Sequence, residues 1–377
     1  MTETNPRKLR GHKAAATCCI ASRDRPGLVA TSGEDGCICW FDMRCKDVQL
    51  VMDVGKEPIS SLCFNSGNED ILYASSEKEV QCFDVHMAVS WKPLQSYSYN
   101  KEEINQIACN SKSSFLAAAD DGGDAKIIDI HQHHLYKTLR AGAGHTSICS
   151  SVQFLPWRPW EVITGGLDSK LIMWDFSKGR PYRIVDFGLP DMNSGSNTGQ
   201  SCNPAFVHML AVPEVDMLDK VDKICVVARG DGVVDVINIE SELAAMRSKS
   251  STKPRKGSQS RSKDSSTTAD IETSDQNGRK RLHLDYSLGG HTAAVSCVAF
   301  SLFGERGKFI ISGGNDKSVK VWDWSKYHDA RQSNGNNDLH LNINLSKKVN
   351  WLCTTPTESE NLVVCDTTKV VKVYSVL

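Results

Sequence analysis

Features that would place the chain in a membrane or secretory class are missing. No apolar run reaches the length of a membrane-spanning helix, about eighteen residues. The opening segment MTETNPRKLRGHK lacks the apolar core of a secretory signal. We therefore expect a protein of the nucleus or cytoplasm that is not secreted and does not contact a membrane.

Metal-site spacing is missing as well. The 14 cysteines contain no C-x-x-C pair and lie mostly in apolar segments, which indicates buried free thiols rather than disulfides or zinc ligands. Three histidines gather in HQHHLYK (residues 131–137), but a metal site there would need ligands from elsewhere. We expect neither a metal nor a cofactor.

Net charge and catalytic signatures are absent too. The 44 basic and 45 acidic residues leave a formal net charge of −1, which excludes a whole-molecule polyelectrolyte binder but not local charged patches. The sequence has no G-x-S-x-G, P-loop, G-x-G-x-x-G or H-E-x-x-H motif. We therefore predict that the protein is not an enzyme.

The sequence does contain a repeat, and its clearest copy is GGHTAAVSCVAFSLFGERGKFIISGGNDKSVKVWDW (residues 289–324). Gly290-His291 opens this unit and Trp322-Asp323 stands near its end, with short apolar runs between them. A Gly-His…Trp-Asp unit of this length is typical of a WD-repeat propeller blade. One blade cannot bury its faces alone, so further copies are expected.

The unit recurs twice with the same internal spacing. An acidic loop residue (Asp35, Asp168 or Asp316) lies six positions before the aromatic residue of the closing pair, and a Thr or Ser lies four positions before that acid. Four weaker copies follow the template. The residues before the seven turns are Phe41, Phe83, Ile128, Trp174, Ile237, Trp322 and Tyr374. We predict an all-β fold, a single seven-bladed WD-repeat β-propeller over residues 1–377.

The two ends of the chain are expected to complete one blade. Residues 371–377 end on the third strand of the seventh blade. Its fourth strand can come only from the N-terminus, so residues about 5–10 should pair with the terminal strand, which removes two open sheet edges.

One long insertion falls within blade five. Residues 240–280 are rich in Ser, Thr, Lys and Arg and nearly free of large apolar side chains, so we predict disorder, apart from a short helical turn at 240–247. The basic residues of the insertion are Lys253, Arg255, Lys256, Arg279, Lys280 and Arg281. They are either solvated charge or a nuclear-import signal or nucleic-acid tether.

Recurring polar residues form sets that combine His, a hydroxyl and Asp. The sets are His12-Thr31-Asp35, His145-Thr164-Asp168-Trp174 and His291-Ser312-Asp316-Trp322, and blade one has Phe41 in place of the tryptophan. A Ser-His-Asp triad is one interpretation, but active sites do not repeat around a ring. Because a buried Asp needs hydrogen-bond partners, we interpret the sets as structural networks.

A short motif follows the third strand of blade one. Phe41-Asp42-Met43-Arg44 places a guanidinium on one rim of the ring, where its fork can bind an acidic or carbonyl acceptor of a partner. The alternative is an intramolecular salt bridge or a solvated Arg.

Outside the loops, the chain resembles the WD repeat-containing protein 53 family. The matching stretches are 102–105 (EEIN), 148–152 (ICSSV), 203–205 (NPA), 313–316 (GGND) and 348–352 (KVNWL). Several of them lie off the general repeat consensus. The resemblance implies a non-catalytic propeller.

Some WD-repeat proteins are substrate receptors of cullin-4 RING ubiquitin ligases and dock on the damaged-DNA-binding protein adaptor through a Trp-Asp-x-Arg motif. Phe41-Asp42-Met43-Arg44 resembles that motif with Phe in place of Trp. The resemblance thus implies a monomeric subunit of a larger complex, which binds a ligase adaptor and an unknown substrate. The alternatives are a nuclear or RNA-associated scaffold that uses the basic insertion, and a hydrolase or similar enzyme in the central channel.

Overall fold

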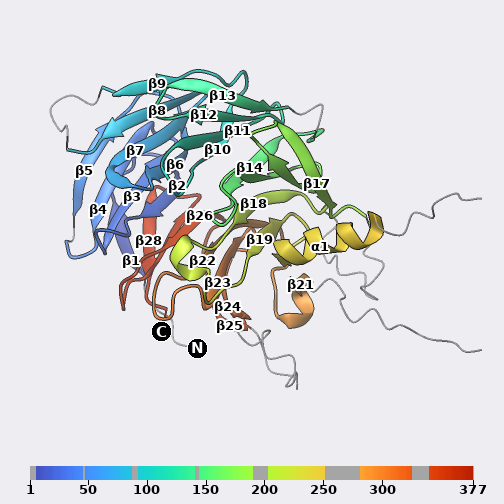
Figure 1. Ribbon diagram of the computed structural model, residues 1–377. Helices are drawn as coiled ribbons and strands as arrows, with labels where there is room; N and C mark the ends of the chain where they lie inside the picture. Colours follow the sequence, from blue (N-terminus) through green and yellow to red (C-terminus); the bar gives the residue numbers. More distant parts are fainter. Residues whose placement is uncertain are drawn as a thin grey trace, which may run out of the picture.

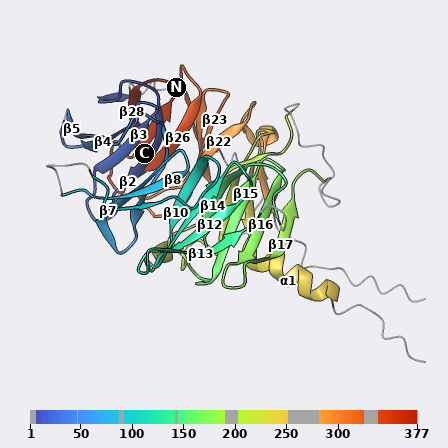
Figure 2. The same cartoon turned by 90° about the horizontal axis from the view of Figure 1, so that it is seen from above.

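The computed structural model describes residues 6–45, 47–86, 92–140, 144–189, 203–250, 281–324 and 339–376. These residues form seven four-stranded antiparallel sheets. The sheets follow one another around a ring (Figures 1 and 2). The predicted seven-bladed propeller is therefore confirmed.

Blades one to four run from an inner to an outer strand in chain order. Blade one consists of β2 (Ala16–Ala21), β3 (Leu28–Gly33), β4 (Cys37–Asp42) and β5 (Val48–Asp53), and blade two of β6 (Ile59–Asn65), β7 (Asn68–Ser76), β8 (Glu79–Asp84) and β9 (Gln95–Tyr97). Blade three consists of β10 (Ile104–Cys109), β11 (Phe115–Asp120), β12 (Ala125–Asp129) and β13 (His134–Leu139). Blade four consists of β14 (Cys149–Phe154), β15 (Glu161–Gly166), β16 (Lys170–Asp175) and β17 (Arg180–Asp186).

Blades five and six repeat this order, whereas blade seven takes one strand from the start of the chain. Blade five consists of β18 (Val207–Ala211), β19 (Ile224–Arg229), β20 (Val234–Asn238) and β21 (Arg281–Leu284). Blade six consists of β22 (Val295–Phe300), β23 (Phe309–Gly314), β24 (Ser318–Asp323) and β25 (Leu339–Asn344). Blade seven consists of β26 (Val349–Thr354), β27 (Leu362–Asp366), β28 (Val370–Tyr374) and β1 (Arg7–Arg10).

The ring is closed by β1, which pairs antiparallel with β28 at the outer edge of blade seven (Figure 1). Leu9 lies opposite Val371 and is buried, whereas Lys8 and Arg10 on either side are exposed. The expected pairing of the two chain ends is confirmed. It covers the backbone groups that β28 and β1 would otherwise leave unpaired.

Burial follows the position of a strand within its blade. Second strands such as β19 (ICVVAR) are buried along their whole length because neighbouring blades pack on both of their faces. Outer strands such as β5 (VQLVMD) alternate between exposed residues and residues that are partly or fully buried. The apolar clusters accordingly join residues of successive blades, for example Phe154 and Trp174 of blade four with Ile127 of blade three.

Every inner strand contains a register shift at its second residue. In six blades, the side chain of this unpaired residue donates a hydrogen bond to the first carbonyl of the next inner strand. The donors are Thr17, Ser60, Asn105, Ser150, Ser296 and Asn350, at 2.5–3.2 Å. The seventh is His208, for which the described residues offer no hydrogen-bond partner and whose pKa is lowered by burial. The six hydrogen bonds from Thr17 to Asn350 connect successive blades around the axis of the ring.

The loops open on two faces. The loops between first and second strands and between third and fourth strands include residues 22–27 and 43–45, and we call their side the Arg44 face. The loops between second and third strands, and those from one blade to the next, include His12, His145 and His291, and we call their side the histidine face.

Blade five carries the helical elements α1 (Ile239–Ser250) and η2 (Val215–Met217). α1 lies beside β17 at the outside of the ring (Figures 1 and 2), where Glu242 pairs with Arg183 of β17 at 2.7 Å. It occupies the first part of the predicted disordered insertion. Residues 251–280 lie outside the described residues, so disorder remains a prediction for them. No helix of the described part of the chain is long and apolar enough to cross a membrane.

Candidate functional site

The structure brings together each of the predicted His, hydroxyl and Asp sets on the histidine face. In blade four, His145 Nδ1 lies 2.9 Å from Asp168 and its Nε2 lies 2.8 Å from Thr164 Oγ1. The Trp174 indole donates to the same hydroxyl at 2.8 Å. A neutral imidazole with its hydrogen on Nδ1 would donate to Asp168 and accept from Thr164.

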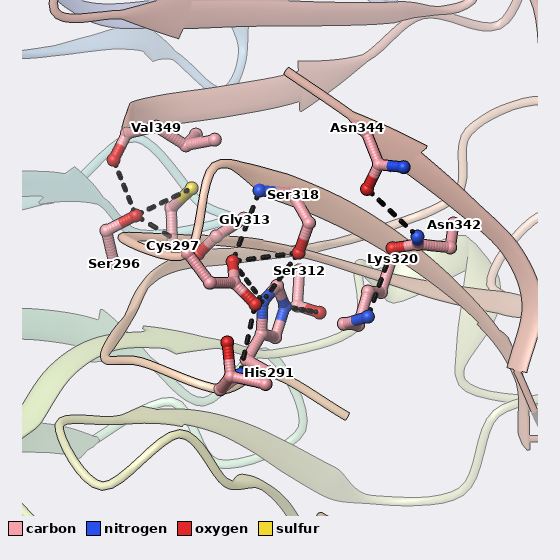
Figure 3. A network of polar contacts seen from close by, with 12 residues as sticks. His291, Ser296, Cys297, Ser312, Gly313, Ser318, Lys320, Asn342, Asn344 and Val349 are labelled. Carbon is pink, nitrogen blue, oxygen red and sulfur yellow. Dashed lines mark hydrogen bonds and ion pairs between the residues drawn. The ribbon is translucent and has the colours of Figure 1, made fainter. Parts of the chain in front are cut away.

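Blade six has the same arrangement. His291 lies 2.8 Å from Ser312 Oγ, which also accepts from the Trp322 indole at 3.0 Å. Figure 3 shows His291 between Ser312 and Ser318, whose hydroxyl lies 3.2 Å from His291 Nδ1. A second contact in this view, from Ser296 to the Val349 carbonyl at 2.7 Å, belongs to the inter-blade bonds of the inner strands.

Blade one has the set without the indole. His12 bonds Thr31 at 2.8 Å and Asp35 at 3.1 Å. Phe41 takes the position of the tryptophan, and the second contact of the Thr31 hydroxyl, besides His12, is the Cys39 carbonyl at 3.4 Å. The network of blade one therefore lacks the hydrogen bond that an indole donates to the hydroxyl in blades four and six.

The charge of these networks lies on the carboxylates. Burial alone would raise the pKa of Asp316, but His291, the Ser318 hydroxyl and the Thr292 N–H stabilise the anion and lower that pKa to about 2. Burial lowers the pKa of His291, against the opposing effect of Asp316. The pair thus favours a carboxylate beside a neutral imidazole.

Catalysis by these sets would need a reachable nucleophile. Thr164 and Ser312 are at most 1% exposed, and both hydroxyls are already bonded to an imidazole and an indole. A substrate carbonyl could not approach either oxygen without opening the blade. The geometry supports a role in holding the loops of the histidine face.

Three other blades hold buried acids by contacts that the sequence analysis did not identify. In blade five, Arg229 pairs with Asp235 at 2.7 Å and also with Asp231 and packs on the Phe187 ring, and His283 bonds Asp235. Burial opposes ionisation of Asp235, but the Arg229 charge lowers its pKa to about 2. A repeated acid near the end of the second strand is the only sequence signal for this group.

Blades three and seven use neutral and lysine partners. Asn100 donates to Asp120 at 2.9 Å in blade three, whereas the neighbouring Asp121 is exposed. Lys372 pairs with the fully buried Asp366 at 2.5 Å in blade seven. Position in the repeat thus places an acid on the histidine face, but its partner differs from blade to blade.

The Phe41-Asp42-Met43-Arg44 motif forms a turn on the Arg44 face. Phe41 is buried, whereas the Arg44 side chain is 81% exposed. The Arg44 guanidinium donates to both oxygens of Asp42, at 2.9 Å from Nε and 2.7 Å from Nη2. This hydrogen bond is the main cause of a lowered Asp42 pKa. The intramolecular salt bridge considered from the sequence is therefore present, and Nη1 has no partner among the described residues.

The closing strand holds this turn in place. Arg7 of β1 donates to the Met43 carbonyl at 2.5 Å and also to the Cys45 carbonyl, and it pairs with Glu360 of blade seven at 2.6 Å. The Met43 N–H donates to Gly27 at 2.8 Å. Arg44 thus stands on a turn that is fixed from blade one and from blade seven.

Of the six basic residues of the insertion, only Arg281 lies within the described residues. Lys253, Arg255, Lys256, Arg279 and Lys280 lie outside the described residues, so the import or nucleic-acid role remains a prediction. Arg281 lies in β21 and donates to Glu242 of α1 at 2.8 Å. Within the described ranges, no three His, Cys, Asp or Glu side chains gather as metal ligands.

Comparison with known proteins agrees with this architecture. A family profile described as "WD domain, G-beta repeat" matches residues 4–42, 135–175 and 283–323. The chain therefore contains WD repeats, and its fold is a seven-bladed propeller. Over 98% of its length it is 27% identical to the WD repeat-containing protein 53 homolog of Dictyostelium discoideum, and the match covers 94% of that protein. The family resemblance expected from the sequence is confirmed.

Two further similarities are more limited. The GATOR2 complex protein WDR24 of Danio rerio is 25% identical over 42% of the chain, and the match covers 20% of that protein. The crystal structure of the WD40 propeller domain of Doa1 superposes with a TM-score of 0.67 over 99% of this chain and 97% of that chain. At 14% sequence identity, this likeness shows the fold alone.

Proposed function

We propose that this WD-repeat protein is a substrate receptor that docks through Arg44 on the adaptor of a cullin-4 RING ubiquitin ligase. WD-repeat propellers are generally non-catalytic scaffolds, and the fold is consistent with protein interaction. We expect the protein in the nucleus or cytoplasm. The substrate would bind elsewhere on the ring.

The observation that carries the proposal is a guanidinium presented on a rigid turn. Asp42 binds one edge of the Arg44 side chain, while the Nη1 edge points away from that carboxylate. An exposed ion pair contributes little to folding, so stability gives only a weak reason for this pair. Fixing a long side chain before binding reduces the entropy lost when a partner binds it.

The test compares two equivalent turns on the Arg44 face. Lys178 of blade four pairs with Asp175 at 2.7 Å and is 73% exposed, so it matches Arg44 in position and exposure. We expect Arg44→Ala to reduce recovery of purified adaptor with the full chain about tenfold or more, because truncation of a central arginine costs about 2 kcal/mol of binding free energy and about 1.4 kcal/mol is tenfold. Lys178→Ala should leave recovery unchanged.

Equal recovery with wild type and Arg44→Ala would rule out this docking site. Equal loss in both variants would also count against it, because it would indicate nonspecific attraction to positive charge. Circular dichroism checks that both variants fold, as expected for two exposed side chains.

A further inference from the structure

The histidine face carries a cationic surface across blades six, seven and one. Its residues are exposed, and we call them the lysine surface: Arg10, Lys13, Lys317, Lys347, Lys348 and Lys369. None of the six forms an ion pair with an acid in the described part of the chain. We propose that this surface binds a short Asp- and Glu-rich segment of a partner protein.

Backbone contacts make the surface continuous. The Leu345 N–H donates to the Lys317 carbonyl at 2.7 Å, just before Lys347 and Lys348. The Thr367 N–H donates to the Lys348 carbonyl at 3.2 Å, which places Lys348 beside the loop that holds Lys369. That loop contacts blade one through Thr368 and Ala16, at 3.3 Å.

The closing strand adds the remaining charges. Arg10 lies opposite Val370, the residue after Lys369, and Lys13 follows in the loop from blade seven to blade one. Acids within the same region are already engaged: Asp366 is buried against Lys372, and Asp316 is bound to His291. The exposed acids nearby are Glu34 and Asp53 of blade one, so six cations meet two anions.

Lys317 is held in a conformation that disfavours a lysine. It has a φ of 61°, at a turn position that glycine occupies in blades one, three and five (Gly36, Gly123 and Gly232). A left-handed non-glycine residue is less stable than glycine at such a turn. Turn chemistry therefore does not favour a lysine at this position, although Ser169 of blade four has the same conformation, with a φ of 62°.

The charged residues on the other half of the histidine face favour one kind of anion over another. The corresponding loops of blades two and three carry five exposed acids and three exposed lysines: Glu57, Glu77, Glu102, Glu103, Asp121, Lys56, Lys78 and Lys101. A nucleic acid lying across the face would meet this acidic half, whereas a short acidic segment would not. Five of the six cations are lysines, which attract an anion as point charges, so a flexible segment with spaced carboxylates can satisfy them without a fixed geometry.

The proposal goes beyond adaptor docking, because the lysine surface and Arg44 lie on opposite faces. The probe is a fluorescein-labelled peptide of alternating Glu and Gly, about twelve residues long, titrated with the full chain by fluorescence anisotropy at low salt. We expect binding that weakens several-fold as NaCl rises from about 50 to about 300 mM, because salt screens exposed charges.

Two triple variants separate this surface from general charge. Lys317→Glu with Lys348→Glu and Lys369→Glu should weaken peptide binding at least about tenfold. Each charge reversal is expected to raise the dissociation constant of the peptide by roughly three- to tenfold. The matched control reverses Lys56, Lys78 and Lys101 on the same face and should change binding less than about twofold. All six lysines are exposed, so both variants should keep the circular dichroism of the wild type.

Arg44→Ala should bind the peptide as the wild type does, so loss of adaptor docking and loss of peptide binding are separate results. Absence of peptide binding at low salt, or equal weakening in both triple variants, would overturn the proposal. Tighter binding of a twelve-nucleotide oligothymidylate, or about tenfold tighter binding of a phosphoserine peptide of equal charge, would overturn it in favour of phosphate.

Discussion

Gly144, just before the histidine of blade four, leaves room for an aromatic ring. A Cβ on Gly144 would lie 2.5 Å from the Trp174 ring, which fills the space beside its backbone. In blade one the ring is smaller, and a Cβ on Gly11 would lie 3.3 Å from Phe41 and 3.0 Å from Cys39. In blade four, the Gly-His and Trp-Asp halves of the repeat are thus a single packing unit.

We predict that Gly144→Ala lowers the free energy of unfolding by about 1–3 kcal/mol, because a rigid indole must move to admit the methyl group. Gly11→Ala should lower the free energy of unfolding by less, since Cys39 and Phe41 need to move by only a few tenths of an ångström. Urea denaturation measures both. In the Trp174→Phe background the cost of Gly144→Ala should shrink, and an unchanged cost there would exclude the ring as its cause.

At the scale of elements, β1 connects the fold to the candidate docking turn. Leu9 packs in a cluster with Phe41 and Met43 of blade one and with Val371 and Val373 of blade seven. Arg7 of the same strand holds the Arg44 turn. Four residues of strand therefore close the ring and position a surface motif.

We predict that Leu9→Ala destabilises the propeller by about 2–5 kcal/mol, the usual cost of truncating a buried leucine. Lys8→Ala is the matched control in the same strand; its side chain is exposed, so its effect should stay within about 0.5 kcal/mol. Thermal denaturation with the full chain measures both. Similar melting temperatures for the two variants would mean that β1 does not support the ring.

The η2 loop is a second element that joins distant blades. Glu214 pairs with Arg23 of blade one at 2.6 Å and with Arg306 of blade six at 3.1 Å. Met217 of the same loop is buried in the cluster shared by blades five to seven. Burial raises the pKa of Glu214 against the effect of the two arginines. This loop therefore covers part of the Arg44 face.

On the scale of the whole molecule, the repeated networks couple stability to pH. Folding lowers the pKa of Asp316 and Asp235 to about 2 from an ordinary value of 3.8, and it lowers those of Asp35 and Asp168 as well. It also lowers the pKa of His291 from 6.5. In each case the unfolded chain takes up its proton at a higher pH than the folded chain.

We therefore predict that the free energy of unfolding reaches its full value near pH 7, starts to fall below about pH 6.5 and falls more steeply below about pH 4. Each carboxylate with a pKa near 2 would contribute up to about 2 kcal/mol, lost as pH falls from 3.8 towards 2. Urea denaturation at a series of pH values tests this. Asp316→Asn should be less stable at neutral pH and have a flatter acid limb; an identical limb would exclude Asp316 as a source.

Much of the architecture could be predicted because its causes are local. The six-residue step from loop acid to aromatic recurs in three repeats, and turn residues and short apolar runs extend the pattern to four weaker copies, so they indicate seven blades without any knowledge of contacts. The pairing of the two chain ends could be predicted because the sequence of the seventh blade contains only three strands. The His, hydroxyl and Asp sets could be chosen for the same reason, since their members lie within one repeat.

The tertiary structure decided what depends on contacts between repeats. Arg229 replaces the histidine in blade five because β19 and β20 bring Asp231 and Asp235 to it. Arg7 reaches the Arg44 turn, and Arg10 joins Lys369, only because the ring closes. Sequence spacing fixes which face a loop occupies, but the side chains that meet across blades depend on strand register and on the curvature of the whole ring.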